Sequence, residues 1–295
     1  METYSRGERA FSFVNYLLLV ILCVVMMYPF FYVFLYSISD SVAASGRTLT
    51  FFPVKPTLYN YKVVLTNSGI MNAFYISVAR TVVGTLAHVI VTTMVAYALS
   101  KPYLVARKTL FVFFMIPMFF SGGLLPFYVV VVKLGLSNSF WVYILPALFT
   151  TFNMLLAKVF FDQIPKSLEE SASIDGAGPG RIFFQIILPS SLPILATLSI
   201  FAGVAQWNSW FDALLFVTKQ DLLPVQTLLY KIILESQAST VEQIMRMSQT
   251  DHQTTISSES IKMTTLMVST LPILFIYPFM QRYFVKGMML GAVKG

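Results

Sequence analysis

A run of closely spaced glycines, preceded by acidic residues, is the first feature of this chain whose residue types could bind a ligand. Residues 176–180 read Gly-Ala-Gly-Pro-Gly, and such spacing can let backbone N–H groups approach a phosphate. The dinucleotide-binding pattern also needs a preceding strand and a further glycine, and Arg181 stands at that position. No Gly-x-x-x-x-Gly-Lys-Ser/Thr sequence occurs either, so we expect no ATPase site and no bound cofactor in this chain.

Other residue types that carry catalysis or bind metals are few and scattered. Cys23 is the single cysteine, which excludes a disulfide within the chain. His88 and His252 are the only histidines, and neither has a second ligand-type residue at metal-binding spacing. The sequence therefore predicts no metal site and no catalytic residue, and it predicts that His88 is a satisfied packing residue.

The segment around the glycines predicts two short helices joined by a tight turn. Pro165 suits a first helical turn, Ser167 and Glu170 have the spacing of a capping box, and Gly176 is placed to end the helix. After the turn at 178–180, apolar residues recur at helical spacing as far as Pro189. Small side chains leave the backbone of this hairpin nearly bare, so we expect it to enter a cleft of another protein.

This segment resembles the EAA loop of bacterial ABC importer permeases, whose pattern is Glu-Ala-Ala, three residues, Gly, nine residues, Ile, any residue, Leu-Pro. Six positions are in register, and Asp175 and Ala177 also match the form common in sugar permeases. Those six are Glu170, Ala172, Gly176, Ile186, Leu188 and Pro189. Ser171 replaces the middle alanine and adds only a hydroxyl. The alternative is an ordinary amphipathic loop.

The resemblance covers most of the chain. Residues 53–61 look like the external connector of sugar permeases, 206–211 resemble their Trp-Asn motif, and 285–295 look like their basic, glycine-rich tail. The chain is most similar to the MalG-like half of carbohydrate importers, and within it to the subgroup associated with complex oligosaccharides.

This resemblance implies a membrane-spanning subunit of an ATP-driven, binding-protein-dependent oligosaccharide importer in a bacterial cytoplasmic membrane. The implied partners are a second permease subunit, a dimer of ATP-binding subunits that hold ATP and Mg, and an extracytoplasmic solute-binding protein that delivers the sugar. The residues implied to couple the chain to its ATPase are Glu169, Glu170, Ala172, Asp175, Gly176, Ala177, Leu188 and Pro189.

A second candidate site lies near the end of the predicted fifth span. Carbohydrate sites combine hydrogen-bonding groups with apolar ring faces, and four residues supply both: Gln206, Trp207, Asn208 and Phe211. The alternative is that Gln206 and Asn208 make hydrogen bonds between helices. Arg80 and Asp212 lie near span ends, where we expect them to reach the membrane interface.

The composition identifies the elements that must position these residues. Of 295 residues, 57% are hydrophobic and 11% are charged, and a soluble domain has about 25% charged residues. Charge-free runs long enough to cross a bilayer predict six spans, at about 12–38, 73–100, 109–132, 139–158, 191–216 and 263–281. The first is too long to be the apolar region of a signal peptide.

The predicted fold class is therefore an all-α integral membrane domain of six transmembrane helices, with a cytoplasmic helix-turn-helix over 159–190 between the fourth and fifth. The third span contains Pro117, Ser121-Gly122-Gly123 and Pro126, which break helices. It could line a pathway, or it could end near Ser121 and be followed by a short interfacial helix.

Basic residues set the predicted orientation. Eleven basic residues lie at the termini or in the loops on the same side of the membrane as the termini, and eight lie on the opposite side. By the positive-inside rule, the side with more basic residues is cytoplasmic. Both termini are therefore expected in the cytoplasm, and 217–262 forms a polar extracytoplasmic loop. The net charge of +7 does not gather on one face, so we expect no nucleic-acid binding. A secondary transporter stays an alternative, although the spans hold no acidic residue near mid-depth.

Overall fold

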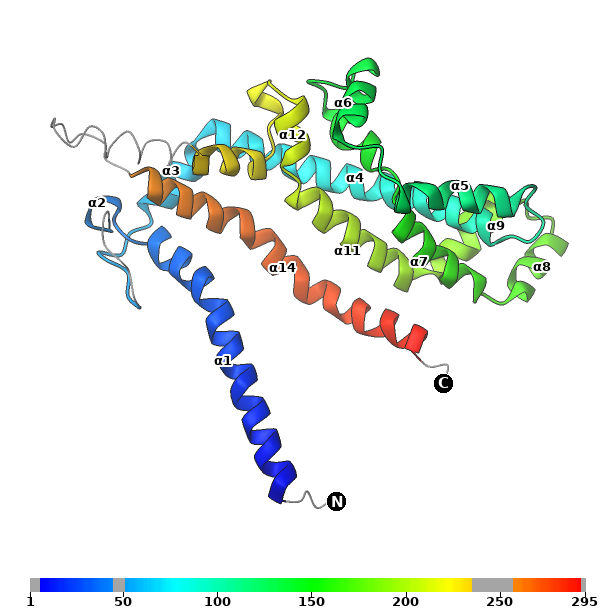
Figure 1. Ribbon diagram of the computed structural model, residues 1–295, viewed down its shortest axis with the longest axis horizontal. Coiled ribbons are helices and arrows are strands. Elements are labelled where there is room, and N and C mark those ends of the chain that lie inside the picture. Colours follow the sequence, from blue (N-terminus) through cyan, green and yellow to red (C-terminus); the bar gives the residue numbers. More distant parts are fainter. Residues whose placement is uncertain (1–5, 45–50, 235–256, 293–295) are drawn as a thin grey trace. The chain divides into compact units, whose positions relative to one another are not determined.

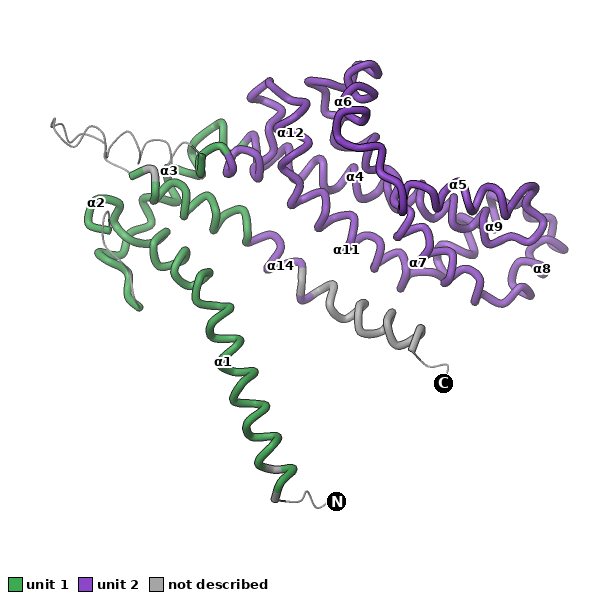
Figure 2. The backbone as a smooth tube through the Cα atoms, in the orientation of Figure 1, with its two compact units in different colours: residues 1–71, 231–270 green, residues 72–230, 271–295 purple. Residues whose placement is uncertain are grey.

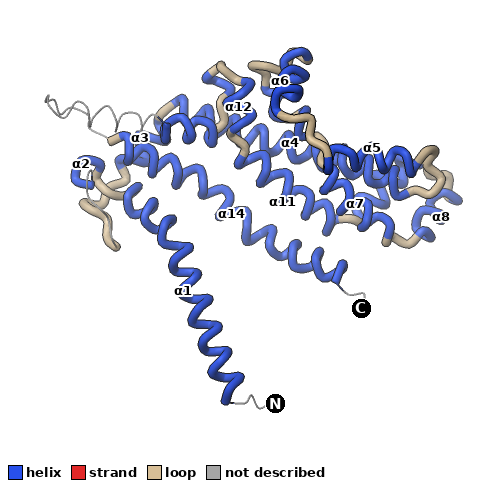
Figure 3. Tube along the Cα trace, viewed as in Figure 1, coloured by secondary structure: helices blue, strands red, loops and turns tan. Residues whose placement is uncertain are grey.

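The computed structural model describes residues 6–44, 51–234 and 257–292, and this part of the chain is helical (Figures 1 and 3). Its one extended pairing is an isolated bridge between Ser39 and Pro56, so the all-α prediction is confirmed for the described residues. His252 and residues 235–256 of the predicted outer loop lie outside them, as do the last three residues of the predicted tail.

Among the described residues, three helices are long and apolar enough to cross a membrane without a break. They are α1 (Arg6–Ser37), α4 (Ser68–Ser100) and α14 (Ser258–Ala292). Their candidate spans run over Ala10–Ser37, Ser68–Ser100 and Glu259–Ile276. These ranges overlap the first, second and sixth predicted spans, because long runs without charge leave few alternatives to a helix. The boundaries of the spans in a membrane stay a prediction.

The third predicted span is broken where its sequence predicted. α5 (Arg107–Phe119) and α6 (Leu124–Lys133) meet at a bend of 116°. Pro117 lies inside α5, and the two glycines lie in the non-helical link. The break itself is confirmed. Its depth in a membrane, and with it the choice between a pathway wall and an interfacial helix, stays a prediction.

The fourth and fifth predicted spans are not single helices. The fourth begins as two 3₁₀ turns, η1 (Phe140–Tyr143) and η2 (Leu145–Ala147), and continues as α7 (Thr151–Asp162) after a bend of 50°. Pro146 removes a backbone donor within η2. The fifth is divided between α11 (Leu192–Asn208) and α12 (Phe211–Phe216) by non-helical backbone at Ser209 and Trp210. A further bend of 84° separates Pro179–Ser190 from Leu192–Asn208, and if each of the three bent pairs is one span, the described residues hold up to six.

The chain divides into two compact units (Figure 2). The first contains residues 1–71 and 231–270, including α2 (Ser41–Ala44) and α3 (Tyr59–Thr66). Within it Asn60 ties the predicted connector to the end of α1, since its Nδ2 donates to the carbonyls of Ser37 (3.0 Å) and Ser39 (2.8 Å). These carbonyls follow the last helical turn and would otherwise lack partners.

The second unit contains residues 72–230 and 271–295, and two apolar clusters build its core. The hairpin cluster includes Leu99, Phe161 and Ile187, and it joins the end of α4 to α7 and to the segment that follows residue 165. The break cluster includes Ile76, Tyr143 and Phe216, and it packs α12, which follows the break after α11, against α4 and η1. The short segments η4 (Gln220–Leu222) and Val225–Leu234 follow α12.

His88 is a packing residue, as predicted. It is 3% exposed, its Nδ1 lies 2.8 Å from the carbonyl of Ala147, and its Nε2 lies 2.8 Å from Nδ2 of Asn153. A carbonyl only accepts, so Nδ1 carries the proton and Nε2 accepts from the amide. The ring thereby links α4 to both halves of the bent fourth span.

Candidate functional site

The predicted helix-turn-helix exists, and its first helix ends as the sequence predicted. α8 (Lys166–Ile174) is capped at its C-terminus by Gly176, whose φ is +82°. Gly176 N donates to the Ser173 carbonyl at 3.1 Å, and Ala177 N donates to the Ala172 carbonyl at 2.9 Å. This pair of hydrogen bonds is a Schellman motif, which needs a left-handed residue and so favours glycine.

The predicted start of this helix is only partly right. The N-cap position is occupied by Pro165, and no side chain caps the helix. Ser167 is inside α8, so the predicted capping box with Glu170 does not form. Ser171 Oγ donates to the Ser167 carbonyl at 2.8 Å. The Ser171 hydroxyl, which departs from the EAA pattern, therefore has its hydrogen-bond partner within its own helix.

The second half of the hairpin is helical up to the next proline, but it is wound unevenly. α9 (Pro179–Ile182) leads into a π-helical turn, η3 (Phe183–Ile187), and then α10 (Leu188–Ser190). Ile182, Phe183 and Ile187 are buried in the hairpin cluster, and Leu188 packs against it. The apolar spacing therefore fixes which face of the second helix is buried.

One ion pair fastens α8 to the end of α4. Lys101 Nζ donates to Glu169 Oε1, and the two side chains are 12% and 19% exposed. The same ammonium lies 4.1 Å from the ring centroid of Tyr97, whose ring centroid is 5.0 Å from that of Phe183. Sequence reasoning listed Glu169 but missed Lys101, because their separation in the chain hides the contact.

A groove of about 890 Å³ lies beside this ion pair, between α8 and the segment 100–107. Glu169, Glu170 and Ala177 line it. The remaining predicted coupling residues have different surroundings: Ala172 is buried, Leu188 is half-buried, and Asp175, Gly176 and Pro189 are exposed. The structure thus brings the predicted set onto one hairpin without making it one pocket.

The outward side of α8 is partly apolar. Ile174 is 86% exposed and Leu168 is 44% exposed, and their six-residue separation puts them about 120° apart around the helix axis. Exposed apolar side chains next to a turn with little side-chain bulk form a surface that another protein could cover.

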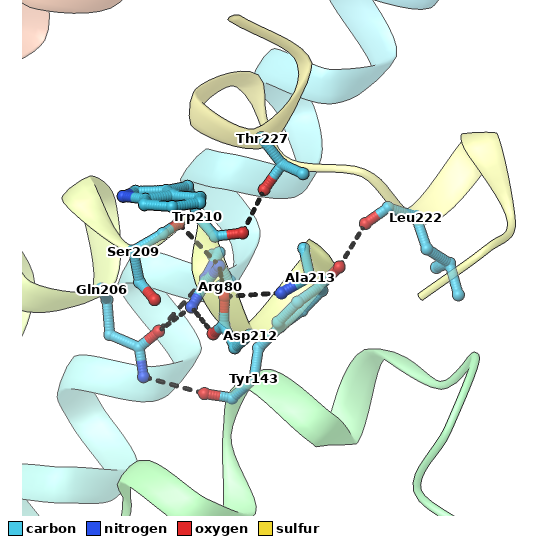
Figure 4. Close-up of polar contacts among 9 residues, drawn as sticks. All are labelled: Arg80, Tyr143, Gln206, Ser209, Trp210, Asp212, Ala213, Leu222 and Thr227. Carbon is cyan, nitrogen blue, oxygen red and sulfur yellow. Dashed lines mark hydrogen bonds and ion pairs between the residues drawn. The ribbon is translucent and has the colours of Figure 1, made fainter. Parts of the chain in front are cut away.

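The second candidate site contains a buried ionic network that the sequence did not predict (Figure 4). Arg80 is 1% exposed, and its Nη2 lies 2.5 Å from Oδ2 of Asp212. The expectation that Arg80 reaches the membrane interface is wrong, because this ion pair and Gln206 hold it inside the second unit. A charge inside an apolar run is itself a sequence signal for a functional or paired residue.

Of the four predicted pathway residues, two are committed to packing. Gln206 is 5% exposed, and its amide donates to the Tyr143 carbonyl at 3.0 Å and accepts from Arg80. Trp207 is 6% exposed and meets Phe74 edge to face, with ring centroids 5.6 Å apart. Asn208 and Phe211 are exposed on either side of the break between α11 and α12. The pattern identified the right segment, but it did not separate buried from exposed positions.

Comparisons with known proteins agree on one family. A family model described as "Binding-protein-dependent transport system inner membrane component" matches residues 81–290. "Polygalacturonan/rhamnogalacturonan transport system permease protein YtcP" of Bacillus subtilis (strain 168) is 36% identical over 288 residues, which cover 98% of this chain and 99% of that protein. "Protein LplC" of the same organism is 35% identical over 291 residues, which cover 99% of this chain and 97% of that protein.

A solved structure matches along nearly the whole chain. It is the crystal structure of a bacterial ABC transporter involved in the import of the acidic polysaccharide alginate. The match has a TM-score of 0.86 and 28% sequence identity, and it covers 96% of this chain and 100% of that one.

The Schellman motif gives a local prediction. Gly176→Ala places a Cβ on left-handed backbone, which costs about 1–2 kcal/mol, so amide exchange at residues 176 and 177 should quicken about five- to thirtyfold. Hydrogen exchange of the full chain in lipid nanodiscs measures this. Gly180→Ala is the matched control, because an added Cβ there meets nothing within 4 Å and its φ is not positive. Equal exchange in both variants would contradict the assignment.

Proposed function

We propose, because the chain belongs to the family of binding-protein-dependent transport system inner membrane components, that it is the membrane-spanning subunit of an ATP-driven oligosaccharide importer. The observation that carries this proposal is the α8 hairpin, a compact projection ended by Gly176 and fastened to α4 by Lys101 and Glu169. The relationship to a sugar permease over 98% of the chain supports the substrate class.

The transport cycle follows from the hairpin's attachments. A dimer of ATP-binding subunits holds ATP and Mg and receives the exposed side of α8, including Ile174. When these subunits close, the hairpin moves, and the hairpin cluster moves with it because Phe183 and Ile187 are buried against α4 and α7. ATP binding thereby favours one of two arrangements of the membrane helices, and the free energy comes from its different affinity for the two states.

The remaining partners complete the assembly. A second permease subunit forms the other half of the pathway, and an extracytoplasmic solute-binding protein delivers the sugar to the side that carries residues 217–262. Both termini and the α8 hairpin lie in the cytoplasm of a bacterial cell, as the distribution of basic residues indicates.

The substrate is an oligosaccharide that contains uronic acids. Polygalacturonan is a polymer of an acidic sugar, and alginate is described as an acidic polysaccharide. Uptake into vesicles that hold the assembled complex and its binding protein tests this class, with an oligogalacturonide as the acidic probe and maltotriose as the neutral one. Uptake of the neutral probe alone would overturn the acidic class while leaving the importer intact.

Asn208 and Phe211 are proposed to face the sugar. Buried residues of α11 recur every four positions, at Ile194, Leu198, Ala202 and Gln206, and Trp207 is buried beside the last of them. Val204 and Asn208 are exposed one turn apart on another face of α11, and Phe211 is exposed at the start of α12, beyond the break. An exposed amide on an apolar membrane helix is costly against lipid, which favours a polar pathway or another chain on this face.

Gly176 and Ile174 test coupling. Gly176→Leu should abolish ATP hydrolysis stimulated by the binding protein, because a bulky side chain disfavours the turn and fills the bare surface. Ile174→Glu should weaken co-purification with the ATP-binding subunits at least tenfold, since burying an isoleucine contributes about 1.5–3 kcal/mol. Gly180→Ala and Ile174→Leu should retain both. Coupled transport in an intact complex of either disruptive variant would sink the proposed docking surface.

The Lys101–Glu169 contact predicts a charge-reversal pattern. Lys101→Glu or Glu169→Lys alone juxtaposes like charges at the joint between α4 and α8, so each should lower uptake per ATP hydrolysed. The double variant restores opposite charges and should recover most of the ratio, with a coupling free energy of about 0.5–3 kcal/mol. Additive losses in the double variant would show that the joint does not transmit motion.

Sugar contact predicts an effect on apparent affinity. Asn208→Ala should raise the KM for uptake about two- to tenfold, because a lost hydrogen bond is worth about 0.5–1.5 kcal/mol. Phe211→Ala should also raise KM by removing an apolar ring face. Val204→Ala is the matched control on the same exposed face one turn away. If neither substitution changes KM more than the control does, these side chains do not contact sugar.

A further inference from the structure

A single side chain from α4, that of Arg80, makes hydrogen bonds on both sides of the break between α11 and α12. All five guanidinium N–H groups of Arg80 can be accounted for. Nε and Nη2 donate to Oε1 of Gln206 at 3.2 and 3.1 Å, and Nη1 donates to the Ser209 carbonyl at 3.2 Å. Nη1 and Nη2 also donate to the two carboxylate oxygens of Asp212 at 3.3 and 2.5 Å. The guanidinium carbon lies 4.3 Å from the ring centroid of Tyr143.

These contacts fall on both ends of the break. α11 ends at Asn208, and the Ser209 carbonyl follows it without continuing the helix. α12 begins at Phe211, so Asp212 is in its first turn, where Oδ1 also accepts from the Ala213 N–H at 2.8 Å. A cation at a helix C-terminus and an anion at a helix N-terminus are both favourable. Arg80 and Asp212 therefore stabilise the broken form over a continuous helix.

A glycine makes room for this network. Gly84 is one turn after Arg80 on α4, and an added Cβ would lie 2.5 Å from Nε2 and 2.7 Å from Cδ of Gln206. Gln206 has little freedom to move away, because Arg80 and the Tyr143 carbonyl hold the two ends of its amide. A methyl group at position 84 would thus disturb the network without removing any charge.

We propose that Arg80 is a positioning residue of the sugar pathway. By holding the end of α11 and the start of α12, it keeps the exposed side chains of Asn208 and Phe211 in one arrangement relative to α4. The inference rests on the proposed function and extends it to residues that do not contact sugar. Because every N–H of Arg80 is engaged, none is left to bind a sugar carboxylate.

Thiol labelling tests the arrangement directly, without any sugar. Cys23 is the only cysteine, so Cys23→Ala provides a cysteine-free background into which Asn208→Cys or Phe211→Cys is introduced. The assembled complex in membrane vesicles is treated with a membrane-impermeant maleimide. Arg80→Gln should change the labelling rate at both positions at least fivefold, because the break relaxes and the two side chains move.

A second variant guards against a misfolded Arg80→Gln. Gly84→Ala should change the same labelling rates in the same direction, and Gly203→Ala should not, since its added Cβ makes an ordinary 3.4 Å contact with Thr85 Oγ1. Unchanged labelling in assembled Gly84→Ala and Arg80→Gln complexes would overturn the proposal. Failure of both to assemble, while Gly203→Ala assembles, would also overturn it, because the network would then serve folding alone.

Uptake kinetics separate positioning from general damage. Oligogalacturonide uptake by Arg80→Gln should show a raised KM with ATP hydrolysis still stimulated by the binding protein, and Arg80→Lys should recover part of the affinity by keeping the charge beside Asp212. A fall in the maximal rate with KM unchanged would contradict positioning. If the unmodified complex imports no oligogalacturonide, the substrate proposal fails, while the labelling result still decides the role of Arg80.

Discussion

Backbone groups that leave a helix among apolar side chains must find hydrogen bonds inside the protein, and the second unit is organised around this requirement. Arg80 donates to the Ser209 carbonyl at the break. Asn138 Oδ1 accepts from the backbone N–H groups of Thr218 and Lys219 after α12, and Ser77 Oγ accepts from that of Val225. These three polar side chains therefore bind backbone groups where helices stop, and each one fixes an irregular segment that an apolar core alone would leave undefined.

α4 is the element through which the two sites can influence each other. It is a continuous helix of 33 residues, with Arg80 at the break and Tyr97 packed in the hairpin cluster. Seventeen residues of helix separate them by about 25 Å. A helix without an internal break transmits a displacement of its end better than the bent pairs can. In the proposed transport cycle, the Lys101–Glu169 ion pair directly after α4 receives the motion, and the Arg80 network on α4 passes it to the break between α11 and α12.

The sequence predicted elements best where a single physical requirement dominates. Long charge-free runs predicted α1, α4 and α14, and the glycine at 176 predicted a left-handed helix end, because few other conformations satisfy either pattern. Sequence reasoning failed where a polar group finds its hydrogen-bond or ion-pair partner in a residue distant in the chain. Arg80 and Asp212 are 132 positions apart, so their pairing leaves no local signature. Ser167 and Glu170 had capping-box spacing, but Pro165 took the cap position and moved Ser167 into the helix.

Exposure means different things on different helices of this chain. The span Ala10–Ser37 of α1 has none of its most apolar window buried. Apart from Asn15 near its start, the side chains exposed along it are apolar, so lipid would satisfy nearly all of that surface. The exposed face of α11 carries Asn208, whose amide lipid cannot satisfy. Its neighbours Gln206 and Asp212 show that polar groups here are normally paired inside the protein. An amide left unpaired beside so complete a network is therefore better explained by a surface that meets water, sugar or a partner chain than by one that faces the bilayer.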